Sequence, residues 1–217
     1  MTLKHPFCNS LFVLMTSILP LAAAPDQPSA YAGKPQSGKP QELPGIIQAE
    51  SYDVAPANAN GIAYNRKGPA QVGAARSAGD CIGLGTVGSD HVSIKGDKEK
   101  EGQIYVGWTE IGDWWNYTVQ VKQAGTYYFG GKFAAGEKGA QIIATFTPVA
   151  KSGKEATTGP LEIPTTAGYQ PAVEVYHVWE TLDKLGEVTL TPGTYILTVK
   201  IEHKAGVNID YYSFTRK

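Results

Sequence analysis

Short runs in which apolar and polar residues alternate recur along residues 46–216, separated by Gly or Pro turns. After the Gly112–Asp113 turn, every second side chain of residues 115–121 is apolar, which is the period of a strand with one buried face. The same period follows Pro192–Gly193. No segment shows a helical period, so the pattern predicts an all-β fold, an antiparallel β-sandwich.

Residues 104–121 hold all but one of the chain's tryptophans. Two strand-like runs flank the Gly112–Asp113 turn, so we expect a β-hairpin. Trp108 falls at the end of the first run, close to a loop, where an indole ring can act as a flat platform. The alternative is that this ring fills the core.

Four pieces of the sequence resemble, in order and spacing, those of family 6 carbohydrate-binding modules, or of the closely related family 35 type. Gly107–Tyr117 is similar to the family's hairpin, and the other pieces are Ile47–Tyr52, Tyr176–Trp179 and Val207–Phe214. The resemblance covers about residues 44–217. It implies a jelly roll that binds, without catalysis, a plant, algal or microbial polysaccharide or its oligosaccharides.

The resemblance also implies a ligand site in the loops at one end of the sandwich. The family's two aromatic contacts and its asparagine before the last strand correspond here to Trp108, Tyr176 and Asn208. Trp179 corresponds to the buried member of the second aromatic motif.

This chain departs from the family pattern at the second aromatic motif. Tyr176 stands where tryptophan is usual, and extra residues 170–175 precede it, which makes Tyr169 an alternative platform. His177 is a candidate hydrogen-bond partner for a sugar hydroxyl in the same loop. For Tyr176, too, a place in the core is the alternative.

Gln48 and Glu50 are two residues apart in a short alternating strand, so they point to the same face. Carboxylate and amide oxygens suit calcium if another segment supplies further ligands. In the resembling family the first strand and the aspartate of the final strand bind a structural calcium, which corresponds here to Gln48, Glu50 and Asp210. From the residues alone, a solvent-facing edge strand is the alternative.

Charge and motifs argue against two classes of function. The formal net charge is −1 with acidic and basic residues interspersed, so there is no basic footprint for nucleic acid. Glu110 and Asp113 flank a turn as a carboxylate pair, the tool of glycoside hydrolysis, but an aspartate after glycine is better explained as a turn residue. Two alternatives stay open: a small polysaccharide-degrading enzyme on the same scaffold, and an adhesion module that binds a protein.

The first 43 residues differ in composition from the rest of the chain. Residues 1–24 contain Lys4 and then an apolar run that ends in small residues, which is typical of a secretory signal peptide; cleavage as late as residue 32 and a buried helix are the alternatives. Residues 25–43, rich in Pro, Gly and Ser, predict a disordered linker. We expect a secreted, extracellular or periplasmic monomer with one domain at 44–217 and no membrane contact after signal removal.

Overall fold

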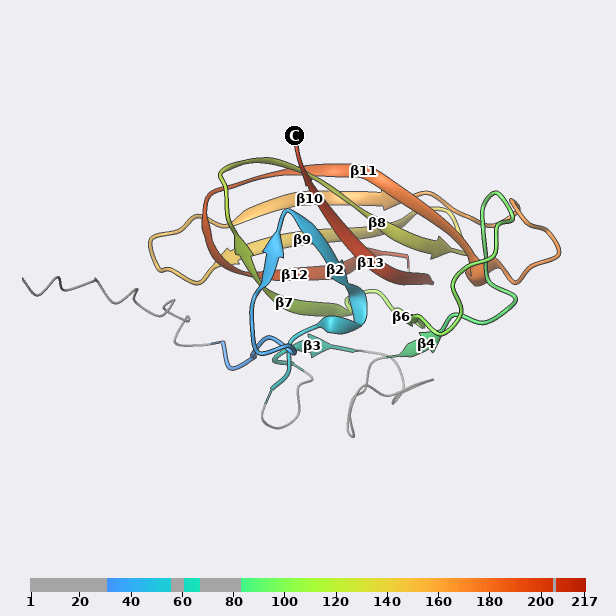
Figure 1. Cartoon of the computed structure of the whole chain (residues 1–217), viewed down its shortest axis with the longest axis horizontal. Coiled ribbons are helices and arrows are strands. Elements are labelled where there is room, and N and C mark those ends of the chain that lie inside the picture. The colour runs from blue at the N-terminus through green and yellow to red at the C-terminus, as the bar shows by residue number, and fades with distance from the viewer. Residues whose placement is uncertain (1–30, 56–60, 67–82, 205) are drawn as a thin grey trace, which may run out of the picture.

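The computed structural model describes residues 31–55, 61–66, 83–204 and 206–217 (Figure 1). The predicted signal peptide lies outside these ranges. The described residues confirm the all-β fold, and none of their helices is long and apolar enough to cross a membrane. The strands and short 3₁₀ helices are β1 (Gln41–Leu43), β2 (Gly45–Gln48), η1 (Ala49–Ser51), β3 (Tyr64–Asn65), β4 (Leu84–Thr86), β5 (Val92–Ser93), β6 (Ile104–Val106), β7 (Trp114–Val121), β8 (Gly125–Ala135), β9 (Ala140–Pro148), β10 (Ala156–Ile163), η2 (Val175–His177), β11 (Val178–Leu190), β12 (Gly193–His203) and β13 (Val207–Arg216).

These strands form two sheets that lie face to face (Figure 1). The first has the order β1-β7-β12-β9-β10, with β3 also paired to β7. The second has the order β4-β6-β13-β8-β11-β5, with β2 paired to β13. The long strands pair antiparallel, whereas β1 with β7 and β5 with β11 are parallel pairs at the edges. From β6 to β13 the chain changes sheet at every connection except that between β9 and β10.

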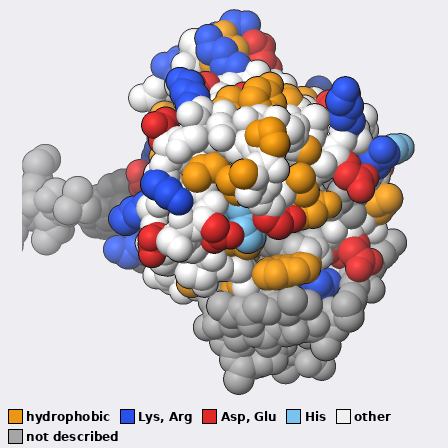
Figure 2. Space-filling model, turned by 90° about the vertical axis from the view of Figure 1, so that its right-hand side faces the viewer, with side chains coloured by type: hydrophobic (Ala, Val, Ile, Leu, Met, Phe, Trp, Pro, Cys, Tyr) orange, Lys and Arg blue, Asp and Glu red, His pale blue; other side chains and the backbone are white. Residues whose placement is uncertain are grey.

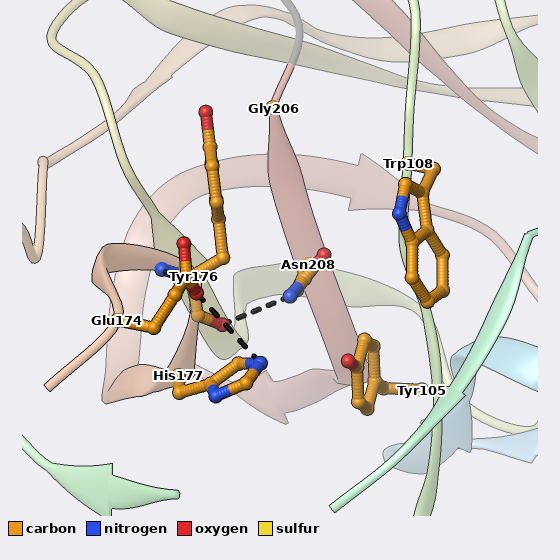
Figure 3. Close-up of a pocket in the computed structure, with 7 residues that line it drawn as sticks. All are labelled: Tyr105, Trp108, Glu174, Tyr176, His177, Gly206 and Asn208. Atoms are coloured by element: carbon orange, nitrogen blue, oxygen red, sulfur yellow. Dashed lines mark hydrogen bonds and ion pairs between the residues drawn. The ribbon is translucent and has the colours of Figure 1, made fainter. Parts of the chain in front are cut away.

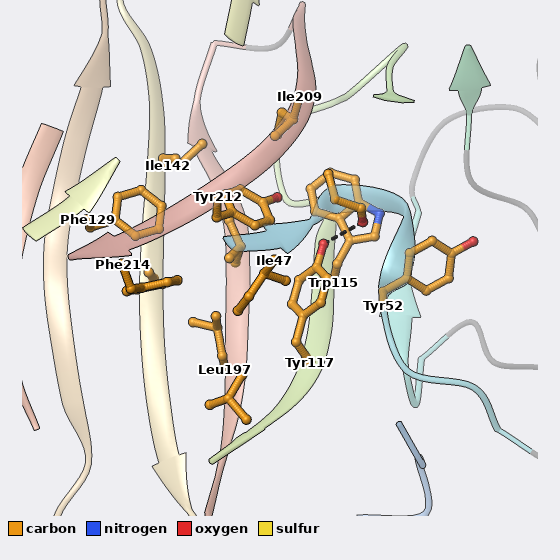
Figure 4. Close-up of a cluster of buried hydrophobic side chains, with 14 of the residues drawn as sticks. Ile47, Tyr52, Trp115, Tyr117, Phe129, Ile142, Leu197, Ile209, Tyr212 and Phe214 are labelled. Carbon is orange, nitrogen blue, oxygen red and sulfur yellow. Dashed lines mark hydrogen bonds between the residues drawn. The ribbon is translucent and has the colours of Figure 1, made fainter. Parts of the chain in front are cut away.

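The core fills the space between the two sheets (Figure 4). Phe129 and Tyr212 face it from the second sheet, and their rings stack with centroids 5.9 Å apart. Tyr117 faces it from β7, its ring edge-on to Tyr212 at 5.7 Å, and its hydroxyl donates to Ala49 O at 2.7 Å. Because buried hydroxyls need partners, this bond also fixes η1 over β7. The apolar positions predicted from the alternation of residues 115–121 are buried, as expected.

The predicted hairpin at residues 104–121 is wrong. The turn exists, since Asp113 N–H donates to Glu110 O at 3.0 Å and Glu110 N–H donates to Asp113 Oδ2 at 2.9 Å. However, β6 pairs with β4 and β13 in the second sheet, whereas β7 pairs with β12, β1 and β3 in the first. The segment is therefore a corner between sheets, and Trp108 lies in the corner rather than in a hairpin strand.

The N-terminal part of the described chain packs on the first sheet. β1 pairs with β7 in parallel, and Leu43 is fully buried. Upstream, Lys34 pairs with Val54, and the Tyr31 hydroxyl donates to Asp53 Oδ2 at 2.8 Å. The ordered region thus begins before residue 44, within the segment expected to be a linker. Backbone pairing to an existing edge does not need an apolar sequence, which is why composition misplaced this boundary.

Candidate functional site

A pocket opens at one end of the sandwich, where the corner after β6, the turn η2 and the start of β13 meet (Figure 3). Its volume is about 340 Å³, the scale of a site for a small ligand. Trp108 and Tyr176 lie on opposite sides, and Asn208 lies between them (Figure 3). The lining residues are Tyr105, Trp108, Glu174, Tyr176, His177, Gly206 and Asn208.

Trp108 forms one wall on an unusual backbone. Its φ is +50°, a left-handed conformation that costs free energy for a bulky residue, and its side chain is 46% exposed. Its indole stacks on Tyr105, with ring centroids 6.4 Å apart and planes 17° apart. Tyr105 is itself buried on Trp179, so the exposed indole rests on a rigid base.

Tyr176 forms the opposite wall from the turn η2. Glu174 caps this turn, because its Oε2 accepts the Tyr176 N–H at 2.8 Å. Asn208 Nδ2 donates to Tyr176 O at 2.9 Å and ties the turn to β13. Two glycines make room for the ring: a Cβ at Gly136 would lie 2.5 Å from Tyr176 Cε1, and one at Gly206 would lie 2.8 Å from its Oη. At Gly206 the φ of +84° also favours glycine.

Asn208 forms part of the pocket floor from the start of β13, and only 7% of its surface is exposed. A carboxamide has two N–H donors and one acceptor oxygen, and the bond to Tyr176 uses one donor. An amide that still offers a donor and its acceptor oxygen between two aromatic walls can fix the orientation of a polar ligand group.

His177 connects the pocket to the loop before β5. Its Nδ1 lies 2.6 Å from Asp90 Oδ2, and its Nε2 lies 3.7 Å from Glu174 Oε2. Its ring stacks on His91 at 3.8 Å, and His91 Nδ1 accepts the Trp179 indole N–H at 2.9 Å. Burial, and after it the neighbouring His177, lower the pKa of His91 to about 4, so His91 is neutral at neutral pH.

Asp90, His91 and His177 place potential metal-ligating atoms within 4.8 Å of one another. His91 Nδ1 already accepts a hydrogen bond from the Trp179 indole N–H, so the neutral ring carries its own proton on Nε2. The Nδ1 lone pair is then engaged by Trp179, and Nε2 carries a proton, so neither nitrogen of His91 is free for a metal. We therefore describe the cluster as a hydrogen-bonded stack that supports the pocket wall.

The structure brings together four of the five residues predicted to contact a sugar: Trp108, Tyr176, His177 and Asn208 all line the pocket. Tyr169, the alternative platform, is 55% exposed but is not among the lining residues. The prediction that Trp179 is buried is confirmed, since 1% of it is exposed.

Sequence reasoning missed Tyr105 and Glu174. Tyr105 occupies an apolar position of a short strand, a pattern typical of a core residue, and it is only 4% exposed. Glu174 belongs to the extra residues 170–175, whose departure from the family pattern was the available signal.

The carboxylates considered for hydrolysis do not form an accessible pair. Asp113 is fully buried, and its Oδ2 accepts the Glu110 N–H. This is the geometry of a turn residue, as the sequence indicated. Neither side chain lines the pocket.

The predicted calcium ligands lie on neighbouring segments. Gln48 pairs with Tyr211, next to Asp210, and Glu50 follows in η1, which packs on β13. Asp210 is 1% exposed, and both its carboxylate oxygens are buried without a hydrogen bond. The Lys132 ammonium lies 3.4 Å from Asp210 Oδ2 and forms an ion pair with it. Buried oxygens that accept no hydrogen bond fit a cation ligand.

The fold is similar to those of known sugar-binding modules. A β-1,3-glucan-binding family 6 module from Bacillus halodurans is 20% identical with a TM-score of 0.50, and the match covers 81% of this chain and 98% of that one. The chain has the fold of a family 6 carbohydrate-binding module. Modules from the Cellvibrio mixtus lichenase 5A, in complex with cellotriose, and from a Zobellia galactanivorans laminarinase are each 19% identical with TM-scores of 0.48, and cover 80% and 79% of this chain and 98% of their own.

No family model matches the sequence, and no curated protein does. The likeness to family 6 modules is thus one of fold, and it covers 81% of this chain in the Bacillus halodurans comparison.

Proposed function

We propose that this chain is a non-catalytic carbohydrate-binding domain that holds a sugar between Trp108 and Tyr176. The observation that carries the proposal is Trp108 itself. A half-exposed indole on a left-handed backbone contributes less to the core than a buried one and costs conformational free energy. Such a residue is better explained by a ligand that covers it than by packing.

The chemistry of the pocket suits a sugar. The C–H faces of a pyranose pack on aromatic rings, which Trp108 and Tyr176 present from opposite sides (Figure 3). Its hydroxyls need donors and acceptors, which the Asn208 amide, the Tyr105 hydroxyl and the His177 ring supply. Glu174 is the one carboxylate among the seven lining residues, so the lining lacks the carboxylate pair of a glycoside hydrolase, which favours binding over hydrolysis.

The fold supports this class of ligand. The Bacillus halodurans module with the same fold is described as binding β-1,3-glucan, and the proposed ligand here is likewise a polysaccharide or its oligosaccharides. The apolar run near the N-terminus supports secretion, which would place the domain where polysaccharides occur.

A glycan array probed with the purified protein tests the proposal. We expect binding to at least one family of glycans, weakened in a Trp108→Ala variant, and no release of reducing ends from the bound polysaccharide. Failure to bind any glycan, with the protein folded, would contradict the proposal. Release of reducing ends would instead favour an enzyme.

We also propose a structural calcium held by Gln48, Glu50 and Asp210, supported by the buried, non-hydrogen-bonded oxygens of Asp210. A ligand that binds only the folded state raises its stability by mass action, so the melting temperature should fall in chelator and recover with calcium. Glu50→Gln should reduce this response. An identical melting curve with and without chelator would mean that Lys132 alone balances Asp210.

A further inference from the structure

The rim of the Trp108–Tyr176 pocket is acidic. None of the seven lining residues is a lysine or an arginine, and Glu174 is 48% exposed at the edge. Asp90, 63% exposed, lies directly behind His177. On this end of the molecule, acidic side chains flank a histidine, with hydrophobic side chains nearby (Figure 2).

The net charge of Asp90, His177 and Glu174 is negative whether or not His177 is protonated. Its two ring nitrogens each face a carboxylate, Asp90 at 2.6 Å and Glu174 at 3.7 Å. With a neutral imidazole the three groups carry two negative charges, and with an imidazolium they still carry one. The hydrogen bond from His177 lowers the pKa of Asp90, which keeps that carboxylate ionised.

The two tyrosine hydroxyls of the pocket experience this field. Burial raises the pKa of Tyr105, and Glu174 and Asp90 raise it further. Burial also raises the pKa of Tyr176, with added contributions from Glu137 and Glu174. A negative potential disfavours phenolate, so the carboxylates raise these pKa values in the same direction as burial does.

The Glu174 carboxylate is held in place. Its Oε2 accepts the Tyr176 N–H, and the segment before it is anchored by Gln170, whose Nε2 donates to Ile94 O at 3.0 Å. Val173 N–H donates to Gln170 O at 2.9 Å, which closes a turn in the same segment. A fixed charge at the rim discriminates among ligands better than a mobile one, because it does not swing away from an unfavourable group.

We propose that Glu174, with Asp90 behind it, makes this pocket select sugars by charge. A glycan with free amino groups binds most tightly, a neutral glycan less tightly, and a glycan of uronic acids least. The inference rests on the proposed function and specifies its ligand class. Unit charges several ångströms apart near a protein surface change affinity by roughly fivefold to tenfold at low ionic strength.

Three β-1,4-linked tetrasaccharides, of glucose, glucosamine and glucuronic acid, test the selection by calorimetric titration. At about pH 6 the amines are charged and carboxylates are ionised. We expect the stated order for the wild type, and differences that shrink in about 1 M NaCl, where exposed charges are screened. Glu174→Gln keeps an oxygen to cap the turn, so it should fold normally and lose most of the discrimination among the three sugars.

Glu162→Gln is the matched control, because Glu162 is an exposed carboxylate on β10, in the other sheet, and does not line the pocket. It should leave the order unchanged. Equal affinity for all three sugars, tightest binding of the acidic one, or an unchanged order in Glu174→Gln would overturn the inference and leave the proposed function intact. If the folded wild type binds none of the three sugars, the charge selection is overturned, and only failure on the whole glycan array would also contradict the proposed function.

Discussion

Replacing either Trp108 or Trp179 with alanine separates a binding residue from a core residue. Trp179 is 1% exposed, packs edge-on against Tyr105 at 5.2 Å and donates to His91. Removing the indole leaves an internal cavity and leaves His91 Nδ1 without its hydrogen-bond donor. Trp179→Ala should therefore lower the free energy of unfolding by about 3–5 kcal/mol or more. For a domain of this size that lowers the melting temperature by roughly ten degrees.

Trp108→Ala should behave differently. About half of the Trp108 surface is already exposed, so truncation opens no enclosed cavity, and we expect a loss of about 1–2 kcal/mol of stability. Binding should weaken as well: a sugar ring on an indole buries apolar area worth on the order of 1–2 kcal/mol, so the Kd should rise about fivefold to thirtyfold.

Calorimetric titration with a glycan found on the array, together with thermal melting, measures both effects. The reasoning is refuted if Trp108→Ala binds as tightly as the wild type. It is also refuted if Trp179→Ala melts normally and loses binding, because the platform and the core residue would then be exchanged.

Two further predictions concern stability. The pKa of His91 is about 4 in the folded state, below the unfolded value of about 6.5, so the unfolded chain binds its proton first. The free energy of unfolding should therefore be at its full value above about pH 6.5 and fall by up to about 3 kcal/mol as the pH approaches 4. His91→Gln should flatten this part of the stability profile. An unchanged profile in this variant would show that His91 is not the group that titrates. A chain that begins at residue 44 lacks β1 and the buried Leu43. It should be less stable than a chain that begins at residue 31, by at least the roughly 2–5 kcal/mol that truncating a buried leucine to alanine costs. Equal urea midpoints for the two chains would mean that β1 does not stabilise the fold.

The alternation of residues 115–121 was enough to predict a strand and its buried face, because the period of two follows from strand geometry alone. It carried no information on the partner strand. The Gly112–Asp113 turn therefore looked like a hairpin, although β6 and β7 belong to different sheets. The strand with which β6 or β7 pairs depends on which sheet edges remain open once the other strands are placed. A local sequence pattern carries no information on those edges.

The site was predictable where a motif fixed it. Trp108, Tyr176 and Asn208 follow from the family resemblance, His177 follows from its place beside Tyr176, and the four meet in one pocket. Glu174 was not predictable, because its place at the rim depends on how residues 170–175 fold back onto Ile94. The family pattern has no counterpart for that segment.

The four tryptophan indole N–H signals offer the most direct test of the central claim. The side chain of Trp108 is 46% exposed in the pocket, whereas Trp115 and Trp179 are each 1% exposed. In an NMR titration with a bound oligosaccharide, the account predicts that the Trp108 signal shifts and saturates with the same Kd as calorimetry, while the Trp115 signal stays in place. A glycan that binds without moving the Trp108 signal would contradict it.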